Sequence, residues 1–164
     1  MRRSNEMAAR RFTLPRFLAL VVAGGAIVMA SGTAFAGPIG VNAFGGWYTD
    51  PKEFELGAGL RMGLGSISFN PNAEYIFREN TTTYTLNLDG TMSIMPLGVA
   101  SIYAGGGVTF FTVDPENGDS NTESGINVLA GAGFNAVPFK PYGQIKYLFI
   151  EGDDPVSFSF GVRF

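Results

Sequence analysis

The sequence predicts an all-β protein: an eight-stranded antiparallel up-and-down transmembrane β-barrel, preceded by a cleaved signal peptide. Three observations predict it. The N-terminal residues combine bases, an apolar run and small residues. The rest of the chain alternates apolar and polar residues at every second position, and the connections between the alternating segments differ in polarity from one to the next.

The first 36 residues have the pattern of a secretory signal peptide. Residues 1–16 carry five arginines and one acid, and the apolar stretch from Phe17 to Ala30 carries no charge. Small residues follow, and Ala34-Phe35-Ala36 fits the small-residue cleavage pattern. Because the apolar stretch is shorter than the ~20 residues of a spanning helix, we expect residues 1–36 to be removed and residues 37–164 to form the barrel.

The composition of residues 37–164 excludes several classes of function. The chain contains no Cys and no His, so thiol nucleophiles, His general bases, Ser-His-Asp hydrolysis and the commonest metal ligands are missing. Six bases stand against 13 acids after residue 36, a formal charge of −7, which leaves no basic patch for nucleic acid. We therefore expect no enzyme activity, no cofactor, no resident metal and no nucleic-acid partner.

The alternation of apolar and polar residues predicts the strands. It is clearest at the C-terminus, where Val156, Phe158, Phe160, Val162 and Phe164 share one face of a strand. Each alternating segment is about as long as the ~9–11 residues with which a tilted strand crosses hydrocarbon, or slightly longer. The predicted strands are 39–49, 54–64, 66–78, 82–94, 99–113, 124–136, 140–151 and 155–164.

The composition of the two strand faces predicts which one meets lipid. One face collects large apolar side chains such as Leu56, Leu86 and Phe110, whereas the other is polar and rich in glycine. An eight-stranded interior is narrow and filled by side chains, so the glycine-rich polar face suits the inside. The alternative is a soluble barrel with its apolar face inward, as in lipocalin-like carriers.

Seven charged residues fall on the predicted inner face. Four bases and three acids come close to neutralising one another, and polar groups in a narrow barrel must be mutually satisfied. An acid–base catalytic site is the alternative, and we favour a structural lumen network over it. Its expected members are Glu55, Arg61, Glu74, Arg78, Asp89, Lys146 and Arg163.

The connections alternate between long polar, acidic loops and short, tight, apolar turns, as at the two ends of a transmembrane barrel. The longest loop is expected at 114–123, and its acids do not have the spacing of an EF-hand loop. We interpret it as a solvated surface for partners; a weak Ca²⁺ or Mg²⁺ bridge to lipopolysaccharide is the alternative. The expected interaction residues are Asp114, Glu116, Asp119 and Glu123.

The chain resembles the small bacterial outer-membrane barrels of the OmpA transmembrane-domain and OmpX type. The resemblance rests on the signal peptide, the eight amphipathic strands and the ending Phe158-x-Phe160-Gly161-Val162-x-Phe164. It implies a monomer in the outer membrane of a Gram-negative cell, in contact with lipid and lipopolysaccharide. It also implies that the barrel-assembly machinery reads Phe158, Phe160, Val162 and Phe164 as a C-terminal signal.

Three functions are compatible with the sequence. The first is a structural or surface-interaction role through acidic extracellular loops. The second is a narrow porin-like channel for small solutes or ions, for which the inward glycines leave room. The third is a soluble periplasmic ligand-binding barrel. Small outer-membrane acyltransferases and deacylases use a His with a Ser, so their mechanism cannot be carried over to a chain without His.

Overall fold

The computed structural model describes residues 39–49, 52–78, 81–97, 99–115, 119–135, 138–150 and 154–164. The predicted signal peptide, residues 1–36, lies outside the described residues. Within the described ranges, no helix is both long and apolar enough to cross a membrane.

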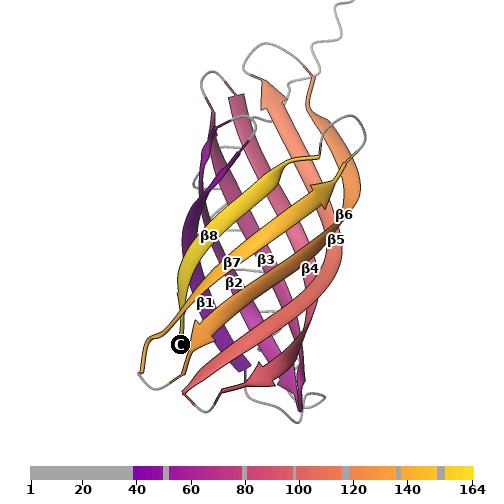
Figure 1. The fold of residues 1–164 in the computed structure, drawn as a ribbon. Coiled ribbons are helices and arrows are strands. Elements are labelled where there is room, and N and C mark those ends of the chain that lie inside the picture. The colour runs from indigo at the N-terminus through magenta and orange to yellow at the C-terminus, as the bar shows by residue number, and fades with distance from the viewer. Residues whose placement is uncertain are drawn as a thin grey trace, which may run out of the picture.

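Eight antiparallel strands close into one barrel, as the sequence predicts (Figure 1). Each strand is hydrogen-bonded to the next along the chain, and β8 returns to pair with β1. Closure leaves no unpaired strand edge, which is a condition for crossing a bilayer with strands. The strands are β1 (Ile39–Tyr48), β2 (Phe54–Leu64), β3 (Ile67–Arg78), β4 (Thr81–Pro96), β5 (Ala100–Pro115), β6 (Asn121–Phe134), β7 (Lys140–Phe149) and β8 (Val156–Arg163).

The connection between β5 and β6 is shorter than predicted. The sequence predicts a loop over 114–123, but β5 continues to Pro115 and β6 begins at Asn121. The ladder persists through the pairs Val113↔Asn121 and Thr112↔Thr122, and the two Thr hydroxyl oxygens lie 3.0 Å apart. At the rim of the barrel both faces of a strand can be polar, because both meet water. Alternation can therefore stop before the strand itself ends.

The two ends of the barrel differ in their connections. The loop end holds 49–53, 79–80, 116–120 and 150–155, and the turn end holds 65–66, 97–99 and 135–139. Gly65 in the first turn has φ 64°, a conformation that L side chains rarely adopt. The last turn, 135–139, is as long as the loop 116–120, so the predicted contrast in length between the two ends is weaker than expected.

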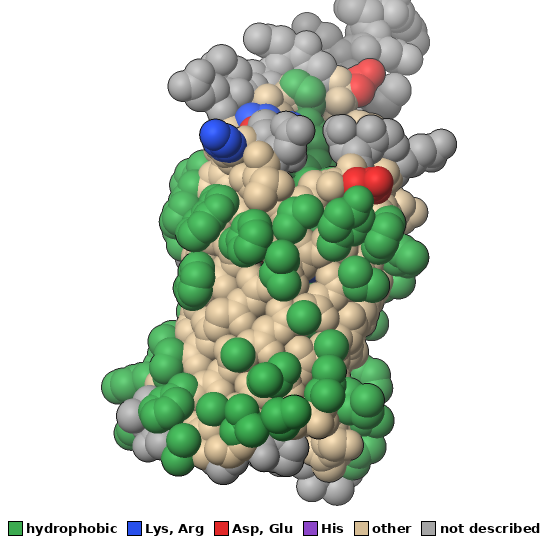
Figure 2. All heavy atoms as spheres, viewed as in Figure 1, with side chains coloured by type: hydrophobic (Ala, Val, Ile, Leu, Met, Phe, Trp, Pro, Cys, Tyr) green, Lys and Arg blue, Asp and Glu red, His purple; other side chains and the backbone are tan. Residues whose placement is uncertain are grey.

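The large apolar side chains point outward. Exposed examples are Leu56, Leu88 and Phe110 at 48, 52 and 49%. Figure 2 shows, on the face in view, hydrophobic side chains spread along the barrel and charged ones near the loop end. This arrangement is the reverse of a soluble carrier barrel, whose apolar face lines the interior.

Aromatic side chains pair on the outer face near both ends of the barrel. Near the loop end, the ring centroids of Phe54 and Phe77 lie 5.7 Å apart. At the turn end, those of Phe139 and Phe164 lie 5.5 Å apart, edge to face. Two zones of aromatic residues are typical of the two membrane interfaces of a transmembrane barrel.

Candidate functional site: the barrel lumen

Polar side chains line most of the lumen. Because strand residues alternate between faces, the outward apolar positions leave every second residue pointing inward. In the central part of the barrel these inward residues are small or medium-sized and able to hydrogen-bond. Less than a tenth of each is exposed, and they include Asn42, Ser68, Thr83, Thr85, Asn87, Thr91, Thr109, Asn127, Ser157 and Ser159.

A buried ion pair crosses the lumen at mid-height. The Nζ atom of Lys146 on β7 lies 2.5 Å from Oε1 of Glu74 on β3, and 3.9 Å from Oδ2 of Asp89 on β4. Lys146 and Asp89 are each 2% exposed and Glu74 is 1% exposed. A buried pair of this kind is not strongly stabilising in itself, but loss of one partner leaves an uncompensated charge in a dry interior.

Two hydroxyl groups donate hydrogen bonds to the second carboxylate oxygen of Glu74. Its Oε2 atom accepts hydrogen bonds from Thr85 Oγ1 at 2.8 Å and from the Tyr48 hydroxyl at 3.0 Å. Tyr48 is 2% exposed and is not among the site residues predicted from the sequence. It lies an even number of residues from the inward Asn42 on β1, so the alternation on this strand does predict that Tyr48 points inward.

Side-chain amides hold the second acid of this layer. Asp89 Oδ2 accepts a hydrogen bond from Asn72 Nδ2, and Asp89 Oδ1 accepts one from Asn127 Nδ2, both at 2.8 Å. Gly107 stands opposite Asp89 on β5. A Cβ atom at Gly107 would lie 2.5 Å from Asp89 Oδ1, so the glycine provides the space that this carboxylate occupies.

Glu55 is the least satisfied acid among the described lumen residues. It is fully buried, and its Oε1 atom accepts a hydrogen bond from Ser157 Oγ at 2.7 Å. Within the described part of the chain its Oε2 atom has no hydrogen-bond partner. We refer to Glu55, Glu74, Asp89 and Lys146, with the hydroxyl and amide groups bonded to them, as the central layer.

The other three predicted network residues lie away from the central layer. At the loop end, Arg78 forms a two-point ion pair with Glu53, through Nε to Oε1 and through Nη2 to Oε2 at 2.8 Å. Glu53 was not predicted, because it lies in a connection where alternation assigns no face. Arg61 and Arg163 lie toward the turn end, so the seven charged residues form three groups rather than one network.

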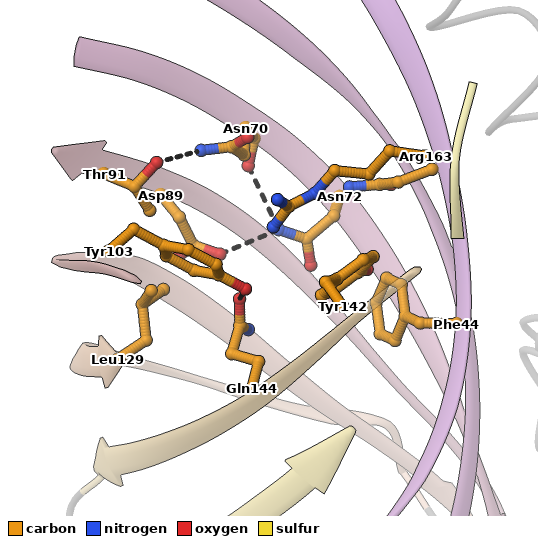
Figure 3. Close-up of a pocket in the computed structure, with 11 residues that line it drawn as sticks. Phe44, Asn70, Asn72, Asp89, Thr91, Tyr103, Leu129, Tyr142, Gln144 and Arg163 are labelled. Atoms are coloured by element: carbon orange, nitrogen blue, oxygen red, sulfur yellow. Dashed lines mark hydrogen bonds between the residues drawn. The ribbon is translucent and has the colours of Figure 1, made fainter. Parts of the chain in front are cut away.

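At the turn end, aromatic rings hold Arg163. Its guanidinium carbon lies 4.0 Å from the ring centroid of Tyr142 and 4.8 Å from that of Tyr103. Figure 3 shows both rings beside this side chain at a small cavity of about 20 Å³. That volume has room for about one water molecule. Nearby, Arg61 Nε donates a hydrogen bond to Ser68 Oγ at 3.1 Å.

At the loop end, the lumen becomes apolar and opens into a larger cavity of about 180 Å³, which we call the vestibule. Below it lies a cluster of inward apolar side chains that the sequence analysis did not predict. Alternation does indicate that these side chains point inward, because Ile76 and Leu148 each lie two residues from an inward residue of the same strand, Glu74 and Lys146. The cluster consists of Tyr48, Ile76, Leu148 and Ile150, with Phe111 packed against it.

The central layer lies between the two cavities. Along β3, the order of inward residues shows this directly: Asn70 and Asn72 line the small cavity, Glu74 belongs to the central layer, and Ile76 and Arg78 line the vestibule. Within the described part of the chain, a packed polar layer therefore separates these two hollows.

The predicted loop residues do not form a single loop cluster. Asp114 lies within β5 and Glu123 within β6, which corrects their predicted place in a loop. Asp119 is exposed, and Glu116 lies outside the described residues. Glu123 Oε1 accepts a hydrogen bond from Asn121 Nδ2 at 2.9 Å. The described residues contain no group of three or more Asp, Glu, Cys or His side chains arranged to hold a metal ion.

The predicted C-terminal signal residues lie on the outer face of the barrel. Phe160 and Phe164 are 61 and 58% exposed, and Phe158 stacks on Trp47 of β1 with ring centroids 6.1 Å apart. Val162 pairs with Ala43 of β1. The backbone N–H of Phe164 donates to the Val41 carbonyl at 2.8 Å, so the pairing with β1 continues to the last residue.

The chain matches no family model and no curated protein sequence. Among solved structures, it is similar to the N-terminal β-barrel domain of OprF from Pseudomonas aeruginosa, with a TM-score of 0.67, 16% identity, and coverage of 77% of this chain and 95% of that chain. Neisserial surface protein A gives a TM-score of 0.60 at 14% identity, covering 76 and 94% of the two chains. Ail from Yersinia pestis, in a phospholipid bilayer nanodisc, gives 0.51 at 12%, covering 78 and 99%.

These likenesses cover nearly the whole of each neighbour and concern the fold. The outward apolar surface and the two aromatic zones described above are, on their own, typical of a transmembrane barrel. By fold, this chain is an eight-stranded antiparallel β-barrel of the kind seen in these small outer-membrane proteins, and its outer surface has the apolar character of a transmembrane barrel.

Proposed function

We propose that the protein is exported with loss of residues 1–36 and acts in the Gram-negative outer membrane as a monomeric, closed barrel. Its rigid wall would stabilise the membrane, and its acidic loop end would contact partners outside the cell. One observation carries the proposal. The central layer interrupts the lumen between the two described hollows, so solutes have no continuous path along it, and large partners can reach the protein only at its surface.

The distribution of charge supports a surface role. Ten of the 13 acids after residue 36 fall in or beside the loop-end connections, against two of the six bases, Lys52 and Arg78. A surface with this charge raises the local concentration of cations and of cationic partners. A divalent cation bridging such acids to lipopolysaccharide belongs to the same proposal. The ten acids are Asp50, Glu53, Glu79, Asp114, Glu116, Asp119, Glu123, Glu151, Asp153 and Asp154.

A catalytic role has little support in the lumen. The acids of the central layer are buried and hydrogen-bonded to Lys146, Thr85, Tyr48 and side-chain amides. Such groups stabilise one another and do not face a space that would admit a substrate. We therefore propose a role without catalysis.

Conductance in planar bilayers tests the closed barrel. We expect the purified protein to insert without producing long-lived conductance steps, because the central layer separates the two hollows. Regular steps in the wild-type protein would contradict the closed barrel and favour a narrow channel. Two variants form a matched pair. Lys146→Ala removes the side chain that crosses the lumen, and it is the variant in which conductance should change. Lys140→Ala removes a lysine at the turn end and should leave the conductance unchanged.

Binding to a cationic surface tests the acidic loop end. Barrels reconstituted in neutral-lipid nanodiscs should bind immobilised polylysine, and the binding should weaken as salt screens the charges. A variant with Asp114→Asn, Asp119→Asn and Asp154→Asn should bind more weakly. Lys140→Gln, at the opposite end of the barrel, serves as the control. Equal binding by all three proteins would contradict the surface role.

A further inference from the structure

The vestibule differs in chemistry from the rest of the lumen. Its wall includes Ile76, Phe111, Ile150 and Pro155, and its rim carries charged and amide side chains. The lumen at and below the central layer is mostly polar. An apolar hollow at the water-facing end of a barrel is costly to hydrate, so an apolar group of suitable size would be more stable there than water.

The volume of the vestibule limits the size of that group. A dry apolar cavity of about 150 Å³ accepts benzene, and the vestibule has about 180 Å³. It therefore has room for a single six-membered ring and one or two further heavy atoms. A fatty acyl chain or a peptide segment would be too large.

The rim of the vestibule is negatively charged. Both oxygens of Glu53 are engaged with the guanidinium of Arg78, so this pair is neutral as a unit. Glu123 lies on the same rim, with one oxygen bonded to the Asn121 amide. Among the described residues that line the vestibule, Glu123 therefore carries a negative charge that no base balances, and a ligand with one positive charge would complement it.

A buried hydroxyl next to the vestibule, at a position that does not line it, lacks a partner among the described residues. Thr83 is fully buried, and its Oγ1 atom has no hydrogen-bond partner within the described part of the chain. In the strand register Thr83 stands between Ile76 on β3 and Val113 on β5, both of which line the vestibule. A buried hydroxyl of this kind is normally hydrogen-bonded. Thr83 does not itself line the vestibule, so a ligand there would contact Ile76 and Val113 and not this hydroxyl.

We propose that the vestibule binds a small organic ammonium ion with an apolar body about the size of one ring. The ring lies against Ile76, Phe111 and Ile150, and the ammonium group lies at the rim beside Glu123. This site goes beyond the surface role proposed above and does not depend on it, since a closed barrel with or without a partner at its loops would hold the same vestibule.

Titration with benzylammonium chloride tests the site. The reconstituted protein carries isotope-labelled methyl groups, and the Ile76, Ile150 and Val113 methyl signals are followed by NMR. We expect saturable shifts at these residues. Benzyl alcohol, of similar size and without charge, should bind about fivefold more weakly, as expected for the loss of one partly screened charge contact. Phenylacetate should produce no saturable shift.

Two classes of variant separate the ring contact from the charge contact. Val113→Trp fills the vestibule and should abolish saturable binding. Phe111→Trp fills it from the neighbouring inward position and replaces the first variant if that one does not fold. Glu123→Gln should weaken benzylammonium about fivefold and leave benzyl alcohol unchanged. Asp119→Asn, an exposed acid that does not line the vestibule, is the matched control and should leave both affinities unchanged.

The shift of gel mobility on boiling establishes that each variant is folded. Linear, unsaturable shifts that persist in the Trp variants would show partition into the lipid and would overturn the proposal. Equal affinities for the three probes, or equal losses with Glu123→Gln and Asp119→Asn, would overturn the ammonium assignment. Conductance and polylysine binding are measured separately, so failure of this site leaves the proposed surface role standing.

Discussion

Lys146 and Glu74 are 72 residues apart in the chain, yet their Nζ and Oε1 atoms lie 2.5 Å apart across the lumen, with 2% of each side chain exposed. The pair joins β7 to β3, two strands that are not neighbours in the barrel. It therefore connects opposite parts of the wall, and its integrity should be measurable as stability of the whole barrel.

Removal of one partner of this pair should be costly. Lys146→Met leaves Glu74 and Asp89 buried without a cation, and we expect a loss of about 3–5 kcal/mol in the free energy of unfolding. The double variant Lys146→Met with Glu74→Gln removes both charges of the pair and should recover most of that loss. Urea unfolding in lipid vesicles measures both. A double variant no more stable than the single one would contradict the pairing.

The same substitution at two depths tests the membrane-facing surface. Leu88 and Leu97 are both 52% exposed, but Leu88 lies at the middle of β4 and Leu97 follows its turn end. Arginine costs about 2–4 kcal/mol at the bilayer midplane of a barrel and about 0–1 kcal/mol near the interface. Leu88→Arg should therefore destabilise the barrel in vesicles much more than Leu97→Arg.

If the two variants unfold at the same urea concentration, the outer surface at Leu88 does not lie in hydrocarbon. Leu88→Ala is the control for loss of the leucine side chain itself. Its effect should be smaller than that of Leu88→Arg, because it introduces no charge.

Gly65 gives a test of backbone conformation alone. Its φ of 64° is left-handed, and an added Cβ would meet no atom within 4 Å. Gly65→Ala should cost about 1–2 kcal/mol, the usual penalty for a side chain in this conformation. Gly65→Asn should cost less, because Asn tolerates it better. Equal unfolding midpoints for the Ala and Asn variants would show that the turn can adopt another conformation.

The C-terminal aromatic residue tests the assembly signal that the family resemblance implies. Deletion of Phe164 should lower the yield of assembled, heat-modifiable barrel while export continues. The deletion also removes the edge-to-face contact with Phe139, so Phe139→Leu is the control, because it removes the contact and keeps the terminal residue. If both changes lower assembly equally, the contact and not the terminal signal explains the loss.

Much of this fold could be predicted from alternation, because the same pattern that forms the strands also assigns each side chain to a face. Alternation does not give height along the barrel axis, which depends on strand tilt and register. For this reason Arg61, Arg78 and Lys146 are all predicted inside, but only the register shows that they lie at different heights. The connections carry no alternation, and so the partner of Arg78, Glu53, could not be predicted.

The vestibule could not be predicted for a different reason. Ile76 and Leu148 are in phase with inward charged residues, yet the composition of the whole inner face predicts a polar interior. An average over a whole face conceals a local reversal of polarity, and the apolar side chains gather only because neighbouring strands bring them to the same end of the lumen.

The unequal lengths of the strands have a consequence for how the protein meets its surroundings. β4 and β5 each have 16 residues, whereas β8 has 8, and about 9–11 are enough to cross hydrocarbon. In Figure 1 the loop-end tips of β5 and β6 stand above the ends of β7 and β8. The β5–β6 side of the barrel therefore extends further at the loop end than the β7–β8 side, and its backbone there stays hydrogen-bonded. A molecule that approaches the loop end would therefore meet an asymmetric surface. The hydrogen-bonded strands of the β5–β6 side project further than the strands of the β7–β8 side.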